Sequence, residues 1–362
     1  MYIKKIKLKN FRNYDSLNIS FDEKVNLITG ENAQGKTNLI EAIYLCAFSR
    51  SFRTHNTPDL IKIGHTECSV YIEFVSEELE KNLTVKINKK GKKMILSGNR
   101  VVRRTAELLN NLVVIVFSPE DLRLIKESPE KRRNFINKEL SQLKPVYYEN
   151  LKKYNECLRQ KNTVLKENRI NNDILDVFDM QLAIYGEKII NEREKFIEKI
   201  SEKANLIQKK ISGGTENLKI RYVKSLEGGK NEIYEKILKS REKDFQYGVC
   251  SFGPHRDDIE FFVNEKNAKK YGSQGQQRTV ALALKLAEIE IAKEVLGEYP
   301  VLLLDDVLSE LDRGRQNFIF NEIEGAQIFI TSTEIGNEIE KKIKHANIYI
   351  IKDKKIRQEF IR

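Results

Sequence analysis

Apolar and polar residues alternate in short stretches over both ends of the chain, which is the period of a β-strand with one buried face. A continuous apolar run at 113–117 is instead typical of a strand buried on both faces. A hairpin-like turn at 88–93, between Ile87 and Met94, carries four lysines. The pattern predicts strands at 3–8, 17–21, 25–28, 68–74, 83–87 and 113–117.

The middle of the chain has a helical period. From Phe178 to Ile211 apolar residues recur every three or four positions, with one step of seven, and charged residues fill the gaps. Gly213 and Gly214 mark the end of this long amphipathic helix. An earlier stretch with the same period, Tyr147 to Leu165, is expected to run antiparallel to it. The two would form a short helical arm whose apolar stripes pack together.

An α/β pattern returns near residue 248. It predicts a strand at 259–263, a helix at 276–296 that Gly297 and Pro300 end, and buried strands at 301–304 and 328–330. We therefore expect an α/β fold in which a helical lobe is inserted into a nucleotide-binding head. The predicted head comprises residues 1–120 and 248–362, and the inserted lobe comprises 121–247.

A phosphate-binding loop lies between the strand at 25–28 and the helix-like segment that follows. Its sequence matches the Walker A pattern G-x-x-x-x-G-K-[ST] with residues Gly30, Glu31, Asn32, Ala33, Gln34, Gly35, Lys36 and Thr37. Glycines let backbone N–H groups close around a phosphate at a helix N-terminus. Lys36 would reach the β- and γ-phosphates of ATP, and the Thr37 hydroxyl would hold Mg²⁺. The plain alternative is a glycine turn before an ordinary helix.

A second acidic motif follows the buried strand at 301–304. Asp305 would stand at the carboxyl end of this strand, as in a Walker B motif, and would hold Mg²⁺ beside Thr37. Asp306 is placed to orient or deprotonate the attacking water. Any buried strand followed by an acidic turn matches this pattern, so its weight comes from the upstream phosphate loop.

A polar, glycine-containing segment opens the helix at 276–296. Ser273, Gly275 and Gln276 make a second helix N-terminus suited to an anion. Because the first loop already occupies one side of the triphosphate, we expect this segment to close on the γ-phosphate of a second copy. A twofold-symmetric dimer would then have two composite sites. The alternative is a glycine–serine turn that only caps a helix.

The bulk composition points to a polyanionic partner. The chain has 362 residues, 40% hydrophobic residues and a formal net charge of +11, which suits nucleic acid or an anionic membrane surface. A charged content of 32% would also suit a heat-tolerant protein. The candidate DNA-phosphate contacts are Lys89, Lys90, Lys92, Lys93, Arg103, Arg104, Arg132 and Arg133.

Cysteine spacing and hydropathy indicate in which cellular compartment the protein is expected. The four cysteines lie far apart, so neither a zinc site nor a disulfide framework is predicted, and cytosolic thiols are the simplest interpretation. No apolar run approaches the roughly 18 residues that a membrane span needs. We therefore expect a cytoplasmic protein without a membrane partner.

Several motifs, in order along nearly the whole chain, resemble the RecF family of recombination mediators, in the SMC-like branch of the ABC ATPases. The short helical arm also fits this family, because the SMC proteins carry far longer coiled coils. The matching segments are 9–14 (KNFRNY), 30–37, 51–54 (SFRT), 118–121 (SPED), 253–258 (GPHRDD), 273–276 (SQGQ), 304–307 (LDDV) and 309–312 (SELD).

The resemblance implies an ABC/SMC-type ATPase head, ATP-dependent dimerisation on double-stranded or gapped DNA, and slow ATP hydrolysis. It also implies cooperation with RecO and RecR in loading RecA at single-strand gaps, in DNA repair, replication and the SOS response. By motif, Arg12 and Asn13 would contact the nucleotide, Glu120 would lie near Mg²⁺ and the attacking water, and Asp312 would lie at the dimer seam. Ser273, Gly275 and Gln276, the ABC signature, would meet the partner's γ-phosphate.

Two departures from the wider ABC pattern predict slow turnover. Asp306 stands where a glutamate is usual, so its carboxylate reaches about 1.3–1.5 Å less far, which can cost on the order of a hundredfold in rate. Ser332 stands where many ABC ATPases have a histidine, and a hydroxyl cannot carry a positive charge to the γ-phosphate.

Other interpretations stay open. The chain could be the nucleotide-binding subunit of a membrane transporter, although Gln274 and Ser332 depart from the usual transporter pattern. It could also be a scaffold that binds ATP without hydrolysing it, which the intact Lys36 and Asp305 argue against. The segment His255–Asp258 could be a metal or catalytic cluster, but a polar turn held by hydrogen bonds is the favoured interpretation.

Overall fold

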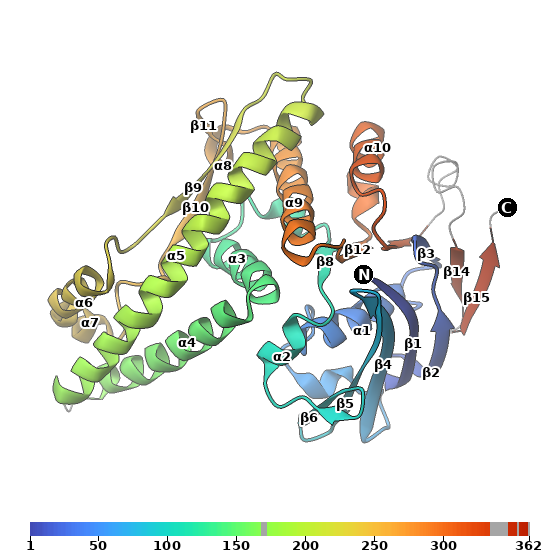
Figure 1. The fold of residues 1–362 in the computed structure, drawn as a ribbon, viewed down its shortest axis with the longest axis horizontal. Helices are drawn as coiled ribbons and strands as arrows, with labels where there is room; N and C mark the ends of the chain where they lie inside the picture. Colours follow the sequence, from blue (N-terminus) through green and yellow to red (C-terminus); the bar gives the residue numbers. More distant parts are fainter. Residues whose placement is uncertain (168–171, 334–346, 353–354, 361–362) are drawn as a thin grey trace. The chain divides into compact units, whose positions relative to one another are not determined.

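The chain forms two compact units in the computed structural model, which describes residues 1–167, 172–333, 347–352 and 355–360 (Figure 1). The first unit joins Met1–Asp121 to Ile289–Arg362, and the second is Leu122–Glu288. The first boundary lies one residue from the predicted one. The second differs, because strand β10 (Asp258–Val263) pairs with β9 (Leu218–Val223), so that 248–288 group with the helical lobe by contact.

A mainly parallel sheet forms the centre of the first unit. Its strand order is β15-β14-β3-β13-β12-β8, and every neighbouring pair is parallel except β14 with β15. β12 and β8 are buried along their whole length, which explains their continuous apolar sequences. The strands are β3 (Val25–Thr29), β8 (Val114–Phe117), β12 (Val301–Asp305), β13 (Ile328–Ser332), β14 (Asn347–Lys352) and β15 (Lys355–Phe360).

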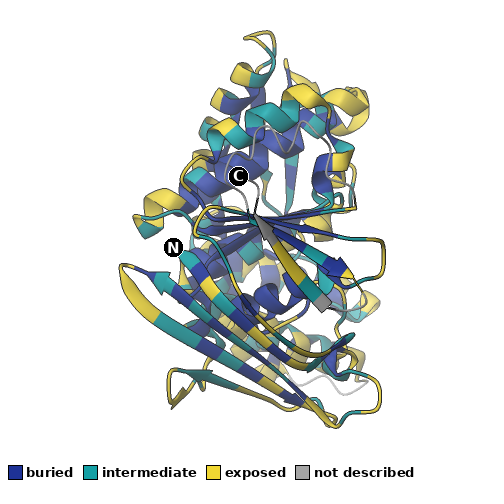
Figure 2. Ribbon diagram, turned by 90° about the vertical axis from the view of Figure 1, so that its right-hand side faces the viewer, coloured by how far each residue is buried: buried dark blue, intermediate teal, exposed yellow. Residues whose placement is uncertain are grey.

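An antiparallel sheet with the order β2-β1-β4-β5-β6-β7 forms the second layer of this unit. Buried and exposed residues alternate along its long strands, as Figure 2 shows and as the sequence pattern predicts. The strands are β1 (Tyr2–Phe11), β2 (Tyr14–Ser20), β4 (Glu67–Ser76), β5 (Leu79–Asn88), β6 (Lys93–Ser97) and β7 (Arg100–Val101).

Helix α1 (Lys36–Phe48) lies between the two sheets and contacts β4 and β5 on one side and β12 and β13 on the other. Its side chains are buried all around the helix, which accounts for the sequence from Leu39 to Phe48 that is apolar except for Glu41. The described part of this unit also contains the shorter helices α2 (Thr105–Leu109) and α10 (Arg313–Glu322) and 3₁₀ turns at Thr57–Leu60, Asp121–Arg123 and Val307–Glu310.

The second unit contains the predicted helical arm. Helix α4 (Pro145–Lys166) packs against α5 (Asn172–Ile211), and α5 runs back along it: Cys157 meets Phe178, while Tyr147 meets Arg193 further along. Gly213 and Gly214 follow α5 with φ angles of 62° and 85°, a left-handed conformation that glycine allows. The arm and its glycine end are confirmed.

The remaining elements of this unit surround the arm. A sheet with the order β11-β10-β9 packs on α5 through β9. Helix α9 begins in the second unit and ends in the first. The other elements are α3 (Pro129–Leu143), α6 (Lys230–Lys239), α7 (Arg241–Tyr247), β11 (Lys266–Asn267), α8 (Ala268–Tyr271) and α9 (Gln274–Leu296).

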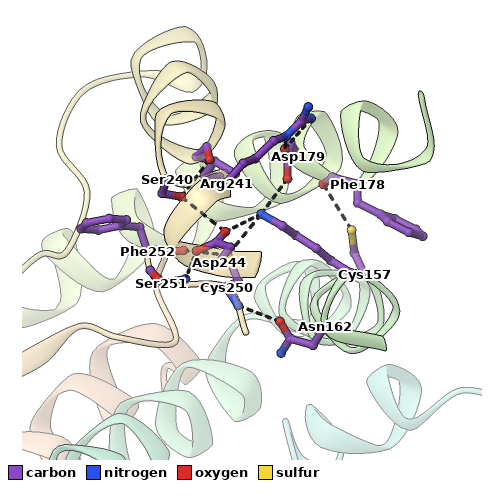
Figure 3. A network of polar contacts seen from close by, with 12 residues as sticks. Cys157, Asn162, Phe178, Asp179, Ser240, Arg241, Asp244, Cys250, Ser251 and Phe252 are labelled. Carbon is purple, nitrogen blue, oxygen red and sulfur yellow. Dashed lines mark hydrogen bonds and ion pairs between the residues drawn. The ribbon is translucent and has the colours of Figure 1, made fainter. Parts of the chain in front are cut away.

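A buried ionic cluster joins three helices of the lobe (Figure 3). The ammonium group of Lys161 on α4 lies 2.8 Å from Asp179 on α5 and 2.9 Å from Asp244 on α7. Arg241 also contacts Asp179, at 2.7 Å. The side chains of Lys161, Asp179 and Asp244 are all 0% exposed. Charged groups can remain buried in a protein interior when they are paired in this way. The cluster therefore fixes the register of the three helices.

Each helix in the described part of the chain is too short or too polar to span a lipid bilayer.

Candidate nucleotide-binding site

The phosphate loop lies where β3 ends and α1 begins, as predicted. Gly30 has a φ angle of 148°, and a Cβ atom there would lie 2.4 Å from the carbonyl oxygen of Ile351. Gly35 has a φ angle of 117°, and its Cβ would lie 2.9 Å from the hydroxyl of Tyr14. Both positions therefore require glycine. The ammonium group of Lys36 donates to the carbonyls of Gly30 (2.6 Å) and Glu31 (3.1 Å), which holds its charge over the loop.

The segment between β1 and β2 forms a side wall of this loop. The Asn13 amide donates to the carbonyl of Gln34 at 2.9 Å, and the Tyr14 hydroxyl donates to the carbonyl of Gly35 at 3.0 Å. Arg12 lies beside them and pairs with the carboxylate of Glu41 on α1. The structure thus brings Arg12 and Asn13 to the phosphate loop, and their contact with a nucleotide stays a prediction.

The Walker B carboxylate meets the phosphate loop at the carboxyl edge of the parallel sheet. The Thr37 hydroxyl donates to Oδ1 of Asp305 at 3.3 Å, and the Thr331 hydroxyl donates to the same oxygen at 2.8 Å. Burial raises the pKa of Asp305. A threonine hydroxyl beside a carboxylate offers the hard oxygen donors that Mg²⁺ prefers, so the residues present fit that ion. No motif in the sequence indicated that Thr331 would contact Asp305.

Asp306 follows in a left-handed conformation with a φ angle of 52°. Its amide donates to the Thr331 hydroxyl at 2.9 Å, which fixes the peptide that directs its side chain. Ser332 ends β13, the strand between β3 and β12, so it lies at the same edge. Glu120 is exposed and follows β8, the neighbour of β12. The strand ends thus gather most of the predicted catalytic groups at one edge.

Asp312 caps helix α10 from the same unit. Its carboxylate accepts a hydrogen bond from the amide of Arg315 at 3.0 Å, and this backbone hydrogen bond lowers the pKa of Asp312. The side chain is largely exposed, so a place at a dimer seam remains a prediction.

The signature residues form a capping box in the second unit. The Ser273 hydroxyl accepts a hydrogen bond from the amide of Gln276 at 3.1 Å, and the Gln276 side chain accepts one from the amide of Ser273 at 3.0 Å. Ser273 and Gly275 are exposed. The turn is therefore a well-ordered start for α9, and its contact with the nucleotide of a second copy is a prediction.

The candidate DNA contacts lie at three places along the chain. Lys89, Lys90 and Lys92 are exposed in the turn between β5 and β6, and Arg103 and Arg104 are exposed after β7. The fourth hairpin lysine, Lys93, donates to the carbonyl of Ser49 at 2.6 Å, and burial lowers its pKa.

The structure contradicts the prediction that Arg132 contacts DNA. It is 3% exposed and forms a two-pronged ion pair with Asp258, with contacts of 2.7 and 2.8 Å. Its guanidinium is therefore used inside the lobe and is not presented to a DNA phosphate. The neighbouring Arg133 is partly buried and donates to the carbonyl of Asp257 at 2.7 Å.

The segment His255–Asp258 is a polar turn held by hydrogen bonds, as the favoured interpretation has it. His255 contacts the Tyr154 hydroxyl at 2.7 Å and the carbonyl of Cys250 at 3.0 Å, and burial lowers its pKa to about 4. Asp257 is 1% exposed and contacts Arg193, itself 2% exposed. Within the described residues, no group of His, Cys, Asp and Glu is arranged to hold a metal ion.

The chain is similar to known proteins along nearly its whole length. The sequence profile of the RecF/RecN/SMC N terminal domain family matches residues 2–357. A Clostridium perfringens protein named DNA replication and repair protein RecF is 45% identical over 338 residues, which is 92% of this chain and 94% of the relative. The chain belongs to the RecF family. A Clostridium botulinum protein of the same name is 44% identical over 365 residues, or 99% of this chain and 100% of its own length.

Solved structures agree with this assignment. One described as "Structure of the recombination mediator protein RecF-ATPrS in RecFOR pathway" has a TM-score of 0.92 and 37% identity, and the match covers 99% of this chain and 98% of that one. An SMC head bound to the C-winged helix domain of ScpA has a TM-score of 0.59 at 17% identity, covers 100% of this chain and 98% of its own, and shares the fold. The predicted RecF resemblance and ABC/SMC-type ATPase fold are confirmed.

Proposed function

We propose that this chain is an ATP-dependent, DNA-binding recombination mediator. It would bind ATP, dimerise, and help to load the recombinase at single-strand gaps during DNA repair and replication restart. The observation that carries this proposal is the 3.3 Å contact between Thr37 and Asp305, which joins the two halves of an ATP site in a chain of the RecF family. The relatives support this function rather than a transporter subunit, since they are named DNA replication and repair proteins.

The chemistry is ATP hydrolysis. The amides of the phosphate loop and the Lys36 ammonium bind the phosphates, and Thr37 and Asp305 would hold Mg²⁺. That ion would neutralise charge on the phosphate oxygens. Asp306 would orient or deprotonate the attacking water, and Glu120 would stand near it. Turnover is slow in this proposal, because Asp306 is shorter than the usual glutamate. DNA would accelerate it.

The active assembly is an ATP-dependent homodimer. Ser273, Gly275 and Gln276 would contact the γ-phosphate held by the partner, and Asp312 would lie at the seam. Arg12 and Asn13 would contact the nucleotide beside the phosphate loop. By motif, residues 1–120 and 248–362 would act together as the ATPase head, and 121–247 as the inserted lobe.

The second partner is double-stranded or gapped DNA. The exposed lysines of the β5–β6 turn together with Arg103 and Arg104 supply positive charge that binds phosphates without reading sequence. RecO and RecR are proposed as protein partners, since the RecFOR pathway is named for a similar structure. Action on chromosomal DNA would place the protein in the cytoplasm.

Sedimentation with and without ATP and gapped DNA tests the proposal. We expect a monomer without ATP and a DNA-bound dimer with ATP, together with slow ATP turnover that DNA accelerates. Lys36→Arg serves as the matched variant, because it keeps the positive charge and much of the binding while turnover stops. A wild-type chain that stays monomeric with ATP and DNA, or whose turnover responds to a membrane fraction and not to DNA, would refute the proposal.

A further inference from the structure

Glu41 is a buried carboxylate on α1, one turn beyond the phosphate loop. Its side chain is 0% exposed, in a helix that is otherwise apolar after Asn38. Arg12 donates to both of its oxygens, from Nε at 2.8 Å and from Nη2 at 2.6 Å. Such a two-pronged pair is the arrangement that lets a carboxylate remain charged in a protein interior. Glu41 therefore fixes the guanidinium of Arg12.

The same carboxylate fixes a second segment through Ser51. The Ser51 hydroxyl can donate one hydrogen bond, and it donates this bond to Oε1 of Glu41. The hydroxyl oxygen also accepts hydrogen bonds from the backbone amides of Arg53 at 2.8 Å and Thr54 at 3.1 Å. All of its hydrogen-bonding capacity is used. The turn that positions Arg53 is therefore held by Glu41.

A chain of directed hydrogen bonds leads from Arg53 to the phosphate loop. Arg53 donates to Oδ1 of Asn38 at 2.8 Å, and the Asn38 amide donates to Oδ1 of Asn13 at 2.8 Å. The Asn13 amide donates to the carbonyl of Gln34 at 2.9 Å. Because a guanidinium has donors and no acceptor, it sets the orientation of both asparagine amides in sequence.

These contacts close a ring, which we call the polar ring. It runs from Glu41 to Arg12, through the adjacent Asn13 to Asn38, on to Arg53, and back through Ser51. Among the contacts that leave the ring, the one from Asn13 to the carbonyl of Gln34 reaches the phosphate loop.

The orientation of that carbonyl matters for phosphate binding. In a trans peptide the C=O and N–H groups point in opposite directions. Asn13 holds the carbonyl of Gln34, so the N–H of Gly35 is directed away from Asn13. Tyr14 holds the carbonyl of Gly35 at 3.0 Å, and this directs the N–H of Lys36 away in the same manner. A carbonyl turned toward a phosphate would repel it, whereas N–H groups attract it.

We propose that Glu41 is a positioning residue of the nucleotide site. It acts through the polar ring on Asn13, and so keeps the peptide between Gln34 and Gly35 oriented for binding the phosphates. This inference rests on the proposed ATP-binding function. It assigns a role to a side chain that would not touch the nucleotide.

Glu41→Gln tests the role, because glutamine keeps the volume and removes the charge that holds Arg12. We expect the affinities for ATP and for ADP, measured by titration calorimetry with Mg²⁺, to fall about tenfold each. The two should fall alike, since the loop amides cradle phosphates that both nucleotides have. Asp244→Asn is the matched control: it also breaks a buried ion pair, but in the second unit, and should leave both affinities within about twofold.

A double-mutant cycle with Asn13→Ala separates positioning from general loss of structure. If Glu41 acts through Asn13, the double variant should bind ATP no more weakly than Asn13→Ala alone, while losses in melting temperature add. Should Glu41→Gln fail to fold, Ser51→Ala removes one hydroxyl of the ring, and its several-fold effect should likewise vanish in the Asn13→Ala background.

Two results would overturn the inference: a folded Glu41→Gln chain that binds ATP like the wild type, or losses that multiply in the double variant. Either result leaves the proposed function standing, provided that the wild-type chain binds ATP. Failure of the wild type to bind ATP would instead refute the proposed function itself.

Discussion

The hydroxyl of Thr37 donates a hydrogen bond to Oδ1 of Asp305 over 3.3 Å and across 268 positions of sequence. The contact joins the first turn of α1 to the end of β12, and it exists because β3 and β12 both flank β13 in one parallel sheet. Neither motif alone supplies both oxygens of the proposed Mg²⁺ site. The pairing of distant strands therefore creates the site.

Asp305→Asn should uncouple nucleotide binding from Mg²⁺. The amide keeps the shape and the contact with Thr331, but it removes the negative charge that would hold the ion. We expect turnover to fall at least about a hundredfold, or roughly 2.7 kcal/mol. The measurement is steady-state ATP hydrolysis over a range of Mg²⁺ concentrations. Unchanged Mg²⁺ dependence in the variant would contradict the assignment.

Asp306→Glu should accelerate hydrolysis. The added methylene carries the carboxylate about 1.3–1.5 Å further toward the attacking water, which is a large displacement on the scale of catalysis. We expect several-fold faster single-turnover hydrolysis with little change in ATP affinity. Asp306→Asn is the companion variant, which should bind ATP and fail to hydrolyse it. A glutamate variant slower than the wild type would show that the shorter carboxylate already has the correct reach.

Ser273→Arg should prevent ATP-dependent dimerisation. An arginine at this exposed turn would meet the bound nucleotide and phosphate loop of the second copy with a bulky side chain. ATP binding by the monomer should be unaffected, which equilibrium binding can check. Thr163→Arg, at an exposed position on α4, is the control for added charge and bulk. Normal dimerisation of Ser273→Arg in sedimentation would reject the composite site.

Acidification should destabilise the protein through His255. Burial lowers the pKa of this histidine from 6.5 to about 4, with the charges of Arg256 and Arg133 acting in the same direction and the Cys250 carbonyl against them. The unfolded chain therefore binds the proton more readily. The stability that the neutral imidazole contributes is complete above pH 6.5 and is lost as the pH falls toward 4.

Between pH 7.5 and pH 5 this histidine should lower the free energy of unfolding by about 2 kcal/mol. Urea unfolding at both pH values measures the loss. His255→Gln cannot take up the proton, so its free energy of unfolding should change less over the same interval. An equal pH dependence in the variant and the wild type would mean that His255 is not the responsible group.

Removal of two hairpin lysines should weaken DNA binding in a salt-dependent way. Lys90→Ala with Lys92→Ala should reduce the slope of log K against log salt by about 2 on duplex DNA, if both ammonium groups bind phosphates. Lys209→Ala with Lys230→Ala removes two exposed lysines of the lobe and is the control. Fluorescence anisotropy at several salt concentrations gives the slopes. Equal slopes for the two double variants would exclude the hairpin as the DNA surface.

The sequence predicted the helices and strands in which apolar residues recur with a clear period. It also predicted the motifs whose residues are close together in the chain. Residues close together in the chain predicted the arm helices, the glycine-dependent phosphate loop and strands β1–β5, β8, β10, β12 and β13, whereas strands β6, β7, β9, β11, β14 and β15 were not predicted. The capping box of Ser273 and Gln276 also lies within four residues, and it was the alternative that the sequence left open for the signature turn.

What the sequence did not reveal depends on distant partners. Arg132 was predicted to contact DNA because its neighbours are basic, but Asp258 neutralises it from 126 positions away. Thr331 and Tyr14 gained roles at the site through strand pairing and a tight turn. Glu41 did carry a signal, since a single acidic residue within an apolar helix has to find a cation once it is buried.

Helix α1 is enclosed on all sides, with its side chains buried from Leu39 to Phe48. A helix packed in this way cannot slide or rotate without opening voids, which interiors at close-packed density resist. Whatever rearrangement accompanies exchange of ATP for ADP should therefore leave this helix in place. Its amide protons should exchange with solvent slowly and at the same rate in either nucleotide state, whereas those of the exposed turn at 273–276 should report the change.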